Sequence, residues 1–312
     1  IPIDSHPKFK NKSALEVIMT TLHSGGKFSN KNYATSGGLH GVGASVVNAL
    51  SSFMKVDVIR KGILYTQEFS KGLPTTKLNK IGSTNRSTGT SISFKPDTTI
   101  FGENNLLNPD KLFKILEYKA YLFGGVQINW QCEASLLKGN TITPNTKKFF
   151  YINGITEYIQ FKTSTIPMFT SSTFHGKVKI EDETVEWVIA WLAHDQPSFI
   201  ETFCNTVPTP LGGSHELGFR HALTKGIRNF ADIKGFKKAN ELIYDDLINS
   251  TGSILSIFIK NPQFQGQTKE RLVNLSSTKL VEIAIKDRFE TWLSNDLSLG
   301  ESILNRTIEN YE

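Results

Sequence analysis

The chain has 312 residues, of which 38% are hydrophobic and 21% charged, and it carries a formal net charge of +6 at pH 7. This length is typical of about two globular domains, and the sequence holds no low-complexity tract or internal repeat. No apolar run approaches the roughly 18 residues that a membrane helix requires, and no signal peptide is visible, so we expect a cytoplasmic protein without a membrane segment.

A glycine-rich loop from Ser36 to Gly43 is the first distinctive segment. Its glycines let backbone N–H groups approach a ligand closely, and the apolar pattern of residues 44–50 predicts a helix directly after it. The loop lacks the lysine of the Walker motif, and its Gly-x-x-Gly-x-Gly spacing reverses that of the dinucleotide fingerprint. Because residues 25–33 are polar and irregular, we interpret the segment as a lid over a bound nucleotide. The alternative is a surface loop that enters a helix through glycine.

The rest of the first half predicts a hairpin, a strand and a capped helix. Residues 54–60 and 63–69 alternate like the two strands of a hairpin, and residues 89–94 form a further strand. Asn108 and Pro109 are a typical helix start, and a strand follows that helix at 126–130. The two cysteines, Cys132 and Cys204, are expected to be free buried thiols.

A second α/β pattern begins after a polar segment near residue 163, so we expect two domains, residues 1–162 and 163–312. Strands are predicted at 174–180, 185–192, 199–205 and 253–260, and helices at 215–230, 240–249, 279–293 and 300–311. The fold class is therefore α/β, in two units.

Basic residues gather on the first long helix of the second half. Arg220, Lys225 and Arg228 recur at helical spacing and could meet DNA phosphates without reading sequence. Charge alone favours the alternative, an ordinary solvated helix face.

Two segments resemble one family. Residues 23–28, 36–43 and 45–51 are similar to the ATP lid of the B subunits of bacterial type IIA DNA topoisomerases, whose ATPase fold is the GHKL type shared with Hsp90, MutL and histidine kinases. Residues 261–272 resemble the loop that the transducer domain of those enzymes inserts into the ATP site. Residues 27–33 and 267–272 look closer to the topoisomerase IV protein than to its gyrase counterpart. The resemblance implies a truncated GHKL-type ATPase sandwich followed by a transducer of ribosomal-protein-like α/β fold.

The resemblance also implies roles for individual residues. Lys269 would bring a positive charge to the γ phosphate of ATP, and Gln267 would donate to the same oxygens; these are the expected catalytic residues. The expected ATP-binding residues are Lys27, Tyr33, Gly38, Leu39, His40, Gly41, Val42, Gly43 and Thr90. The threonine matches one that helps to bind adenine, whereas the lid glycines offer main-chain N–H groups to the β and γ phosphates. From the residues alone, Thr90 is equally an ordinary strand residue, and Lys27 and Tyr33 are plausible surface residues.

Part of the family pattern is absent from these 312 residues. The Glu-x-x-x-Asn-x-x-Asp helix, which supplies the general base and the magnesium ligand, does not occur, nor does the Asp-x-Gly-x-Gly turn that binds adenine. Residues 1–4 correspond to positions just after that turn. We expect ATP and Mg²⁺ as cofactors, with the magnesium ligand in a preceding segment and no metal site in this chain. Alone, the chain is expected to bind ATP weakly and to hydrolyse essentially none.

The implied partners are DNA without sequence preference, the topoisomerase A protein in an A2B2 assembly, and a second copy of the B protein on ATP binding. DNA-cleavage chemistry is not expected in this chain. Two alternatives stay open from the sequence: a catalytically inactive nucleotide-binding remnant, and a GHKL ATPase of the mismatch-repair type.

Overall fold

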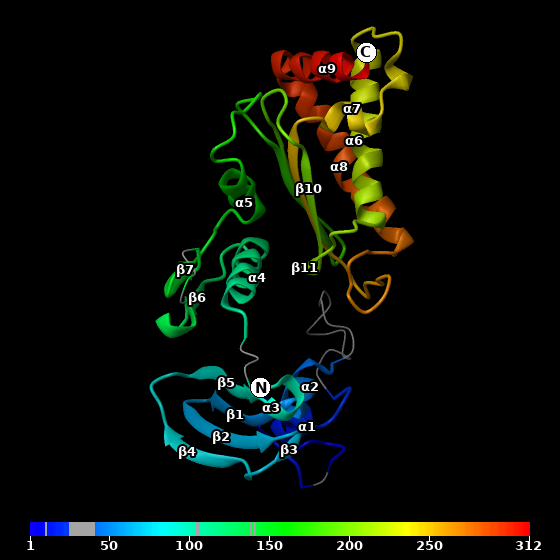
Figure 1. The fold of residues 1–312 in the computed structure, drawn as a ribbon. Helices are drawn as coiled ribbons and strands as arrows, with labels where there is room; N and C mark the ends of the chain where they lie inside the picture. The colour runs from blue at the N-terminus through cyan, green and yellow to red at the C-terminus, as the bar shows by residue number, and fades with distance from the viewer. Residues whose placement is uncertain (10, 25–40, 104–106, 138, 140–141) are drawn as a thin grey trace. The chain divides into compact units, whose positions relative to one another are not determined.

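The computed structural model describes residues 1–9, 11–24, 41–103, 107–137, 139 and 142–312 (Figure 1). The chain forms two compact units, which we describe separately. The N-terminal unit holds the described residues up to Leu107, and the C-terminal unit runs from Asn108 to Glu312.

A twisted antiparallel sheet forms the N-terminal unit. Its strand order is β3-β2-β1-β5, and β4 pairs with β2 beside β3. The strands are β1 (Ser51–Arg60), β2 (Ile63–Ser70), β3 (Leu73–Pro74), β4 (Asn79–Ser83) and β5 (Thr88–Pro96). The predicted hairpin is confirmed: Lys61 and Gly62, with φ of 52° and 75°, make the tight turn between β1 and β2.

Short helices accompany this sheet: α1 (Ala14–Thr20), α2 (Gly43–Ala49) and α3 (Thr98–Phe101). The core forms where Leu15 and Met19 of α1 pack against Met54, Val56 and Phe69 of the central strands. Helix α2 confirms the predicted helix after the glycine-rich loop. Helix α1 is not predicted from the sequence, although Ser13 caps it by accepting a hydrogen bond from the Glu16 N–H at 3.1 Å.

The C-terminal unit begins with α4 (Pro109–Leu122), and the helix start predicted at Asn108 is confirmed. The Asn108 side chain accepts a hydrogen bond from the Lys111 N–H at 3.0 Å. A small sheet of β6 (Ile128–Gln131) and β7 (Thr146–Phe149) follows, with the 3-10 turn η2 (Ala134–Leu137) between its strands and α5 (Ile155–Lys162) after it. Ala120, Trp130 and Phe149 form the core shared by α4 and this sheet.

The main sheet of the C-terminal unit has the order β11-β10-β12-β9-β8, and β10 and β12 are parallel. Its strands are β8 (Phe174–Ile180), β9 (Glu183–Trp191), β10 (Phe199–Cys204), β11 (Val207–Pro208) and β12 (Thr251–Phe258). The further helical elements are α6 (Ser214–Ile233), η3 (Ala239–Glu241), α7 (Tyr244–Ile248), α8 (Leu275–Asn295) and α9 (Leu297–Tyr311). The helix predicted at 240–249 is therefore shorter than expected, because residues 239–241 form a 3-10 turn.

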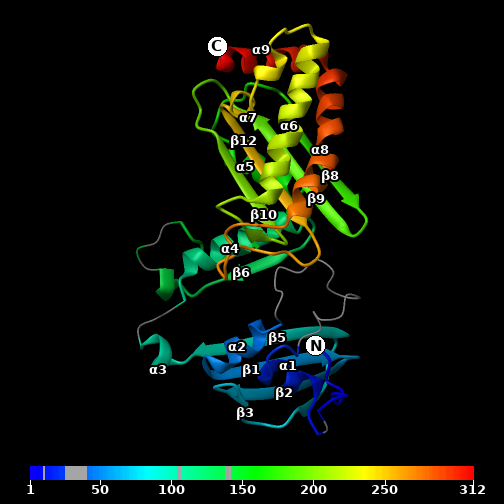
Figure 2. The same cartoon turned by 90° about the vertical axis from the view of Figure 1, so that its right-hand side faces the viewer.

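Helices cover both faces of this main sheet (Figures 1 and 2). On one face, Trp187 and Trp191 of β9 join the core of α6 and α8. On the other face, Ile155 and Ile159 of α5 pack against Val188. The mixed α/β fold expected from the sequence is thus present in both units.

The division by packing differs from the predicted domain boundary. The units separate after Leu107, whereas the sequence predicts a boundary after residue 162. Helix α5 is not predicted, and its contacts with β9 join residues 155–162 to the second sheet. Cys204 is a buried free thiol as expected, and Cys132 is free but only half-buried. Among the described residues, no helix has both the length and the apolarity needed to cross a bilayer.

Candidate functional site

Of the glycine-rich loop, the structure describes Gly41, Val42 and Gly43. Gly41 has φ of 59°, in the left-handed region that favours glycine, and a Cβ at Gly43 would meet no atom of the described residues within 4 Å. The other expected lid residues lie outside the described residues: Lys27, Tyr33, Gly38, Leu39 and His40.

Asn48 anchors the helix that follows this loop. Its side chain is fully buried, and its Nδ2 donates to the Met19 carbonyl at 2.9 Å. The backbone carbonyl of Asn48 accepts a hydrogen bond from the Gly72 N–H at 3.1 Å. One asparagine thus joins α2 to α1 and to the turn after β2. The sequence analysis did not single out Asn48, and the only signal was a polar residue on the buried side of a short helix.

Thr90 lies on β5, directly opposite Val58 of β1. Paired residues of antiparallel strands share a face, so Thr90, Ile92 and Phe94 lie on the side of the sheet whose central strands pack against α1. Thr90 is exposed, and Ile92 and Phe94 keep 46% and 44% of their surfaces exposed. Among the described residues, the helices of the N-terminal unit therefore leave β5 exposed on this face.

An apolar hollow of about 280 Å³ borders β5. It is lined almost wholly by hydrophobic side chains from α2, β5, α3 and their connections: Val47, Leu50, Ser51, Phe94, Pro96, Phe101 and Leu107. Exposed apolar surface of this extent commonly marks a contact with another segment or partner.

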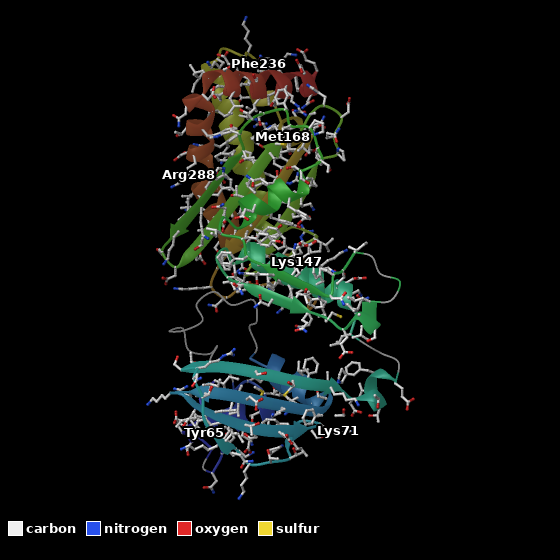
Figure 3. The ribbon with its side chains drawn as sticks, turned by 90° about the vertical axis from the view of Figure 1, so that its left-hand side faces the viewer. Tyr65, Lys71, Lys147, Met168, Phe236 and Arg288 are labelled. Atoms are coloured by element: carbon white, nitrogen blue, oxygen red, sulfur yellow. The ribbon has the colours of Figure 1, made fainter. Side chains whose placement is uncertain are left out.

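Asp97 fixes the start of α3 at one side of the hollow. Its carboxylate accepts from the Thr99 N–H at 3.0 Å and lies 2.9 Å from the Nζ of Lys71, which is labelled in Figure 3. The hydrogen bond from Lys71, followed by that from the Thr99 backbone, lowers the pKa of Asp97 below its ordinary value. The carboxylate therefore stays ionised at neutral pH.

The second candidate segment, which we call the 259–274 loop, connects β12 to α8. The Gln265 N–H donates to the Arg271 carbonyl at 2.9 Å, and the Val273 N–H donates to the Gln263 carbonyl at 2.9 Å. The two legs of the loop are therefore hydrogen-bonded to each other, like a short hairpin.

Gln267 and Lys269 lie two residues apart at the tip of this loop. Gln267 is exposed and Lys269 is half-buried, with φ of 61°. Beside them, the Glu270 carbonyl accepts from the Leu211 N–H at 3.0 Å, and the Glu270 side chain accepts from the Thr268 hydroxyl at 3.2 Å. The structure thus brings the two expected catalytic residues together on an anchored tip.

Gly213 allows the 259–274 loop to pack against the start of α6. The Leu272 N–H donates to the Gly212 carbonyl at 3.1 Å, and the Leu272 carbonyl accepts from the Ser214 N–H at 3.0 Å. A Cβ at Gly213, whose φ is 135°, would collide with the backbone of Leu272. Gly213 is therefore required by this close approach, a role that its position before a helix start did not indicate.

His215 is buried beneath the same junction. It has no exposed surface, and its Nε2 lies 3.0 Å from the Thr209 hydroxyl, which lies 2.6 Å from the Thr202 hydroxyl. Burial lowers the pKa of His215 to about 4, so the ring is neutral at pH 7. This residue was also missed from the sequence.

The three expected DNA contacts all have partners within the C-terminal unit. Arg220 donates to Glu216 at 2.9 Å and lies 4.4 Å above the Tyr244 ring. Lys225 pairs with Glu282, and the Nε of Arg228 donates to the Leu242 carbonyl at 2.7 Å. The carboxylates of Glu216 and Glu282 compensate the charges of Arg220 and Lys225 locally, which the spacing of the basic residues did not reveal.

Comparison with known proteins places this architecture in a family. The family model for DNA gyrase B matches residues 154–312. The chain belongs to the DNA gyrase B family. Along its whole length, this DNA gyrase B family member is similar to the B subunit of DNA topoisomerase 4 from Bartonella bacilliformis, with 45% identity over 314 residues. That alignment covers 45% of the Bartonella protein, so the chain spans about half the length of the curated relatives it matches.

Two solved structures cover almost all of this gyrase B family chain. The topoisomerase IV ATP binding domain of Francisella tularensis, in complex with a small-molecule inhibitor, is 29% identical with a TM-score of 0.79, and the match covers 99% of this chain and 80% of that one. The 43K ATPase domain of Thermus thermophilus gyrase B, in complex with an aminocoumarin, is 28% identical with a TM-score of 0.79. That match covers 99% of this chain and 77% of the Thermus chain. The family and the fold class expected from the sequence are therefore confirmed.

Within the described ranges, no three His, Cys, Asp or Glu side chains are grouped so that they could hold a metal ion.

Proposed function

We propose that this chain is the ATP-binding and transducer part of a topoisomerase IV-type B subunit, which couples ATP binding and hydrolysis to DNA strand passage. The observation that carries the proposal is the match along the whole chain to the B subunit of a topoisomerase 4. The mismatch-repair alternative is set aside, because the family model for DNA gyrase B covers the second half of the chain.

Main-chain N–H groups of the glycine-rich loop, Gly41 and Gly43 among them, bind the β and γ phosphates of ATP, and Thr90 helps to bind adenine. Lys269 supplies a compact positive charge to the γ phosphate, where negative charge shifts as the terminal bond breaks, and Gln267 donates to the same oxygens. The anchored tip of the 259–274 loop supports this role, because a positioned charge stabilises a transition state better than a mobile one.

We further propose that the general base and the magnesium ligand belong to a segment outside these 312 residues. The uncovered face of β5 and its apolar hollow support this, since they offer a contact surface for such a segment. Loss of a general base typically slows a reaction by about 10² to 10⁴-fold. The isolated chain therefore binds ATP weakly and hydrolyses essentially none.

The proposed assembly contains DNA, the topoisomerase A protein in an A2B2 complex, and a second copy of the B protein that pairs on ATP binding, in the bacterial cytoplasm. DNA would be contacted through phosphates, without sequence preference. Arg220, Lys225 and Arg228 stay candidates for this contact, although each would have to share its charge with the intramolecular partner described above.

ATP hydrolysis and decatenation by the intact protein with its A-protein partner test the proposal. Lys269→Ala is expected to lower kcat for ATP about 10²-fold, because one positioned donor to developing charge is lost. Nucleotide binding should change only a few-fold. Lys237→Ala, which removes an exposed lysine elsewhere in the same unit, is the matched control and should keep both activities. Wild-type turnover by Lys269→Ala would contradict the proposal.

A further inference from the structure

Asn205 holds the base of the 259–274 loop. Its Nδ2 donates to the Ile259 carbonyl at 2.9 Å, and its Oδ1 accepts from the Ile259 N–H at 2.8 Å. Both residues are 2% exposed. Ile259 is the first residue beyond β12, so the amide of Asn205 takes the place that a neighbouring strand would occupy and satisfies both buried backbone groups.

The loop base is closed from its other side by Asn274, the residue before α8. Its Oδ1 accepts from the Gln263 N–H, and its Nδ2 donates to the Asn261 carbonyl at 3.3 Å. Two asparagine side chains from different parts of the fold therefore hold the two legs of the loop. Asn205 connects the loop to the turn between β10 and β11, and Lys260 connects it to β9, because the Lys260 N–H donates to the Glu183 side chain at 3.3 Å.

The residue after Asn205 is held in turn by α4. Lys119 of α4 donates from its Nζ to the Thr206 carbonyl at 2.8 Å and also to the Thr206 hydroxyl. Lys119 forms no ion pair with a carboxylate of the described residues, and burial lowers its pKa below the ordinary value for lysine. Because this half-buried lysine donates both hydrogen bonds to one residue, it links α4 specifically to Thr206 and does not act as a solvated surface charge.

A tight turn links the hydrogen bonds of Asn205 with Ile259 to those of Thr206 with Lys119. Asn205 and Thr206 have φ of 49° and 64°, and they form the two-residue connection between β10 and β11. A turn of this kind has little backbone freedom. Displacement of α4 would therefore move Thr206 and Asn205 together, and with them Ile259 at the base of the loop.

We propose that Asn205 is a positioning residue for Lys269, and that Lys119 couples the 259–274 loop to α4, the helix with which the C-terminal unit begins. The proposal rests on the proposed role of Lys269 at the γ phosphate. Asn205 does not touch the nucleotide; it fixes the strand end from which the loop departs.

The experiment uses the intact protein and measures hydrogen exchange in residues 259–274 together with kcat and KM for ATP. Asn205→Gly keeps the left-handed turn but removes both side-chain bonds, and it should speed exchange at the loop base about tenfold or more. We expect kcat to fall at least about threefold, with a smaller change in KM, since the loop acts in the transition state. Asp195→Gly, at an exposed residue with φ of 62°, controls for the added backbone freedom. It should change neither the exchange rate of the loop nor the kinetic constants for ATP.

Two further variants keep the proposal testable if Asn205→Gly folds poorly. Asn205→Asp keeps the acceptor for the Ile259 N–H but loses the donor, so it should give intermediate exchange and an intermediate kcat. Lys119→Met keeps the aliphatic stem and loses the ammonium group, and it should also speed exchange at the loop base. If Lys119→Met changes exchange in α4 alone, the coupling to α4 is wrong.

The outcomes separate this inference from the proposed function. If Lys269→Ala abolishes hydrolysis but Asn205→Gly leaves loop exchange and kcat unchanged, the positioning role is wrong and the proposed function stands. If Asn205→Gly speeds loop exchange while both variants keep wild-type kcat, the attachment exists but the role of Lys269 is wrong. If Asn205→Gly shows faster loop exchange and a reduced kcat, and Asp195→Gly shows neither change, the positioning role of Asn205 and the role of Lys269 are both supported.

Discussion

The 259–274 loop and the face of β5 that carries Thr90 are supported in opposite ways. The 259–274 loop has hydrogen bonds between its legs, an asparagine at each side of its base and a glycine where it crosses the start of α6. The N-terminal unit instead leaves a strand face exposed at Ile92 and Phe94, beside an apolar hollow. The 259–274 loop is therefore held by contacts within the C-terminal unit, whereas the described residues leave this face of β5 exposed.

The largest effect is expected at the crossing of the 259–274 loop and α6. Gly213→Ala places a Cβ against the Leu272 backbone, so the loop or the helix must move, and the C-terminal unit should lose about 3 to 5 kcal/mol of stability. Urea unfolding followed by tryptophan fluorescence reports this unit alone, because all four tryptophans lie after residue 107.

Gly235→Ala is the matched control for that substitution. Gly235 also has a positive φ, of 78°, but a Cβ there would meet no atom within 4 Å, so only about 1 to 2 kcal/mol of backbone strain is expected. Equal losses in the two variants would show that the close approach at Gly213 does not matter.

A pH-dependent effect is expected from His215. Its pKa is about 4 in the folded protein and ordinarily about 6.5, so between these values the unfolded state binds the proton and the folded state does not. The free energy of unfolding should therefore fall as the pH drops from 6.5 to 4, by roughly 3 kcal/mol in total.

Urea titrations at pH 7.5 and 4.5 measure this loss. In His215→Gln the loss between these two pH values should be smaller than in wild type by about 2 to 3 kcal/mol. His194→Gln, at an exposed histidine of the same unit, should behave as wild type. An unchanged pH dependence in His215→Gln would show that His215 titrates normally.

A smaller effect is expected where the glycine-rich loop opens to the ligand. Gly41→Val forces a β-branched residue into a backbone with φ of 59° and places side-chain atoms beside the main-chain N–H groups. Nucleotide affinity of the intact protein, measured by calorimetry, should fall about 10 to 100-fold. Gly102→Val, with φ of 82° and open space around it, carries similar strain away from the loop and should keep its affinity. Equal affinity in both variants would remove Gly41 from the site.

The smallest effect in the isolated chain is expected at the exposed face of β5. Phe94→Ser should cost about 1 kcal/mol or less in the 312-residue chain, because Phe94 is already 44% exposed. In the intact protein the same change should cost about 2 to 3 kcal/mol, if a further segment covers this face. Phe69→Ser, at a fully buried residue of the same sheet, should be strongly destabilising in both the 312-residue chain and the intact protein. Calorimetric unfolding compares the two contexts, and equal small costs for Phe94→Ser would show that nothing covers β5.

The sequence predicted those features that depend on local patterns. Alternation over residues 54–69 and 174–180 predicted strands that the structure confirms, and Asn108 with Pro109 predicted the start of α4. Helix α1 was missed because its seven residues are held mainly by packing of Leu15 and Met19 against the sheet.

The supports of both candidate sites could not be predicted, because they are tertiary contacts. Asn48, Asn205 and His215 are single polar residues in apolar surroundings, and their roles depend on partners 29, 54 and 6 positions away along the chain. The positive charges of α6 were predicted, but the partner of Lys225, Glu282 on α8, comes from an element distant in sequence.

The central claim, that the 259–274 loop is formed without nucleotide, is tested most directly by hydrogen exchange in the isolated 312-residue chain. The amides of Ile259, Gln265, Leu272 and Val273 should exchange at least about 10²-fold more slowly than unstructured amides, because each donates within the loop or to its supports. Addition of ATP should leave these rates nearly unchanged. Exchange at the unprotected rate before ATP is added, with protection appearing only afterwards, would contradict the account.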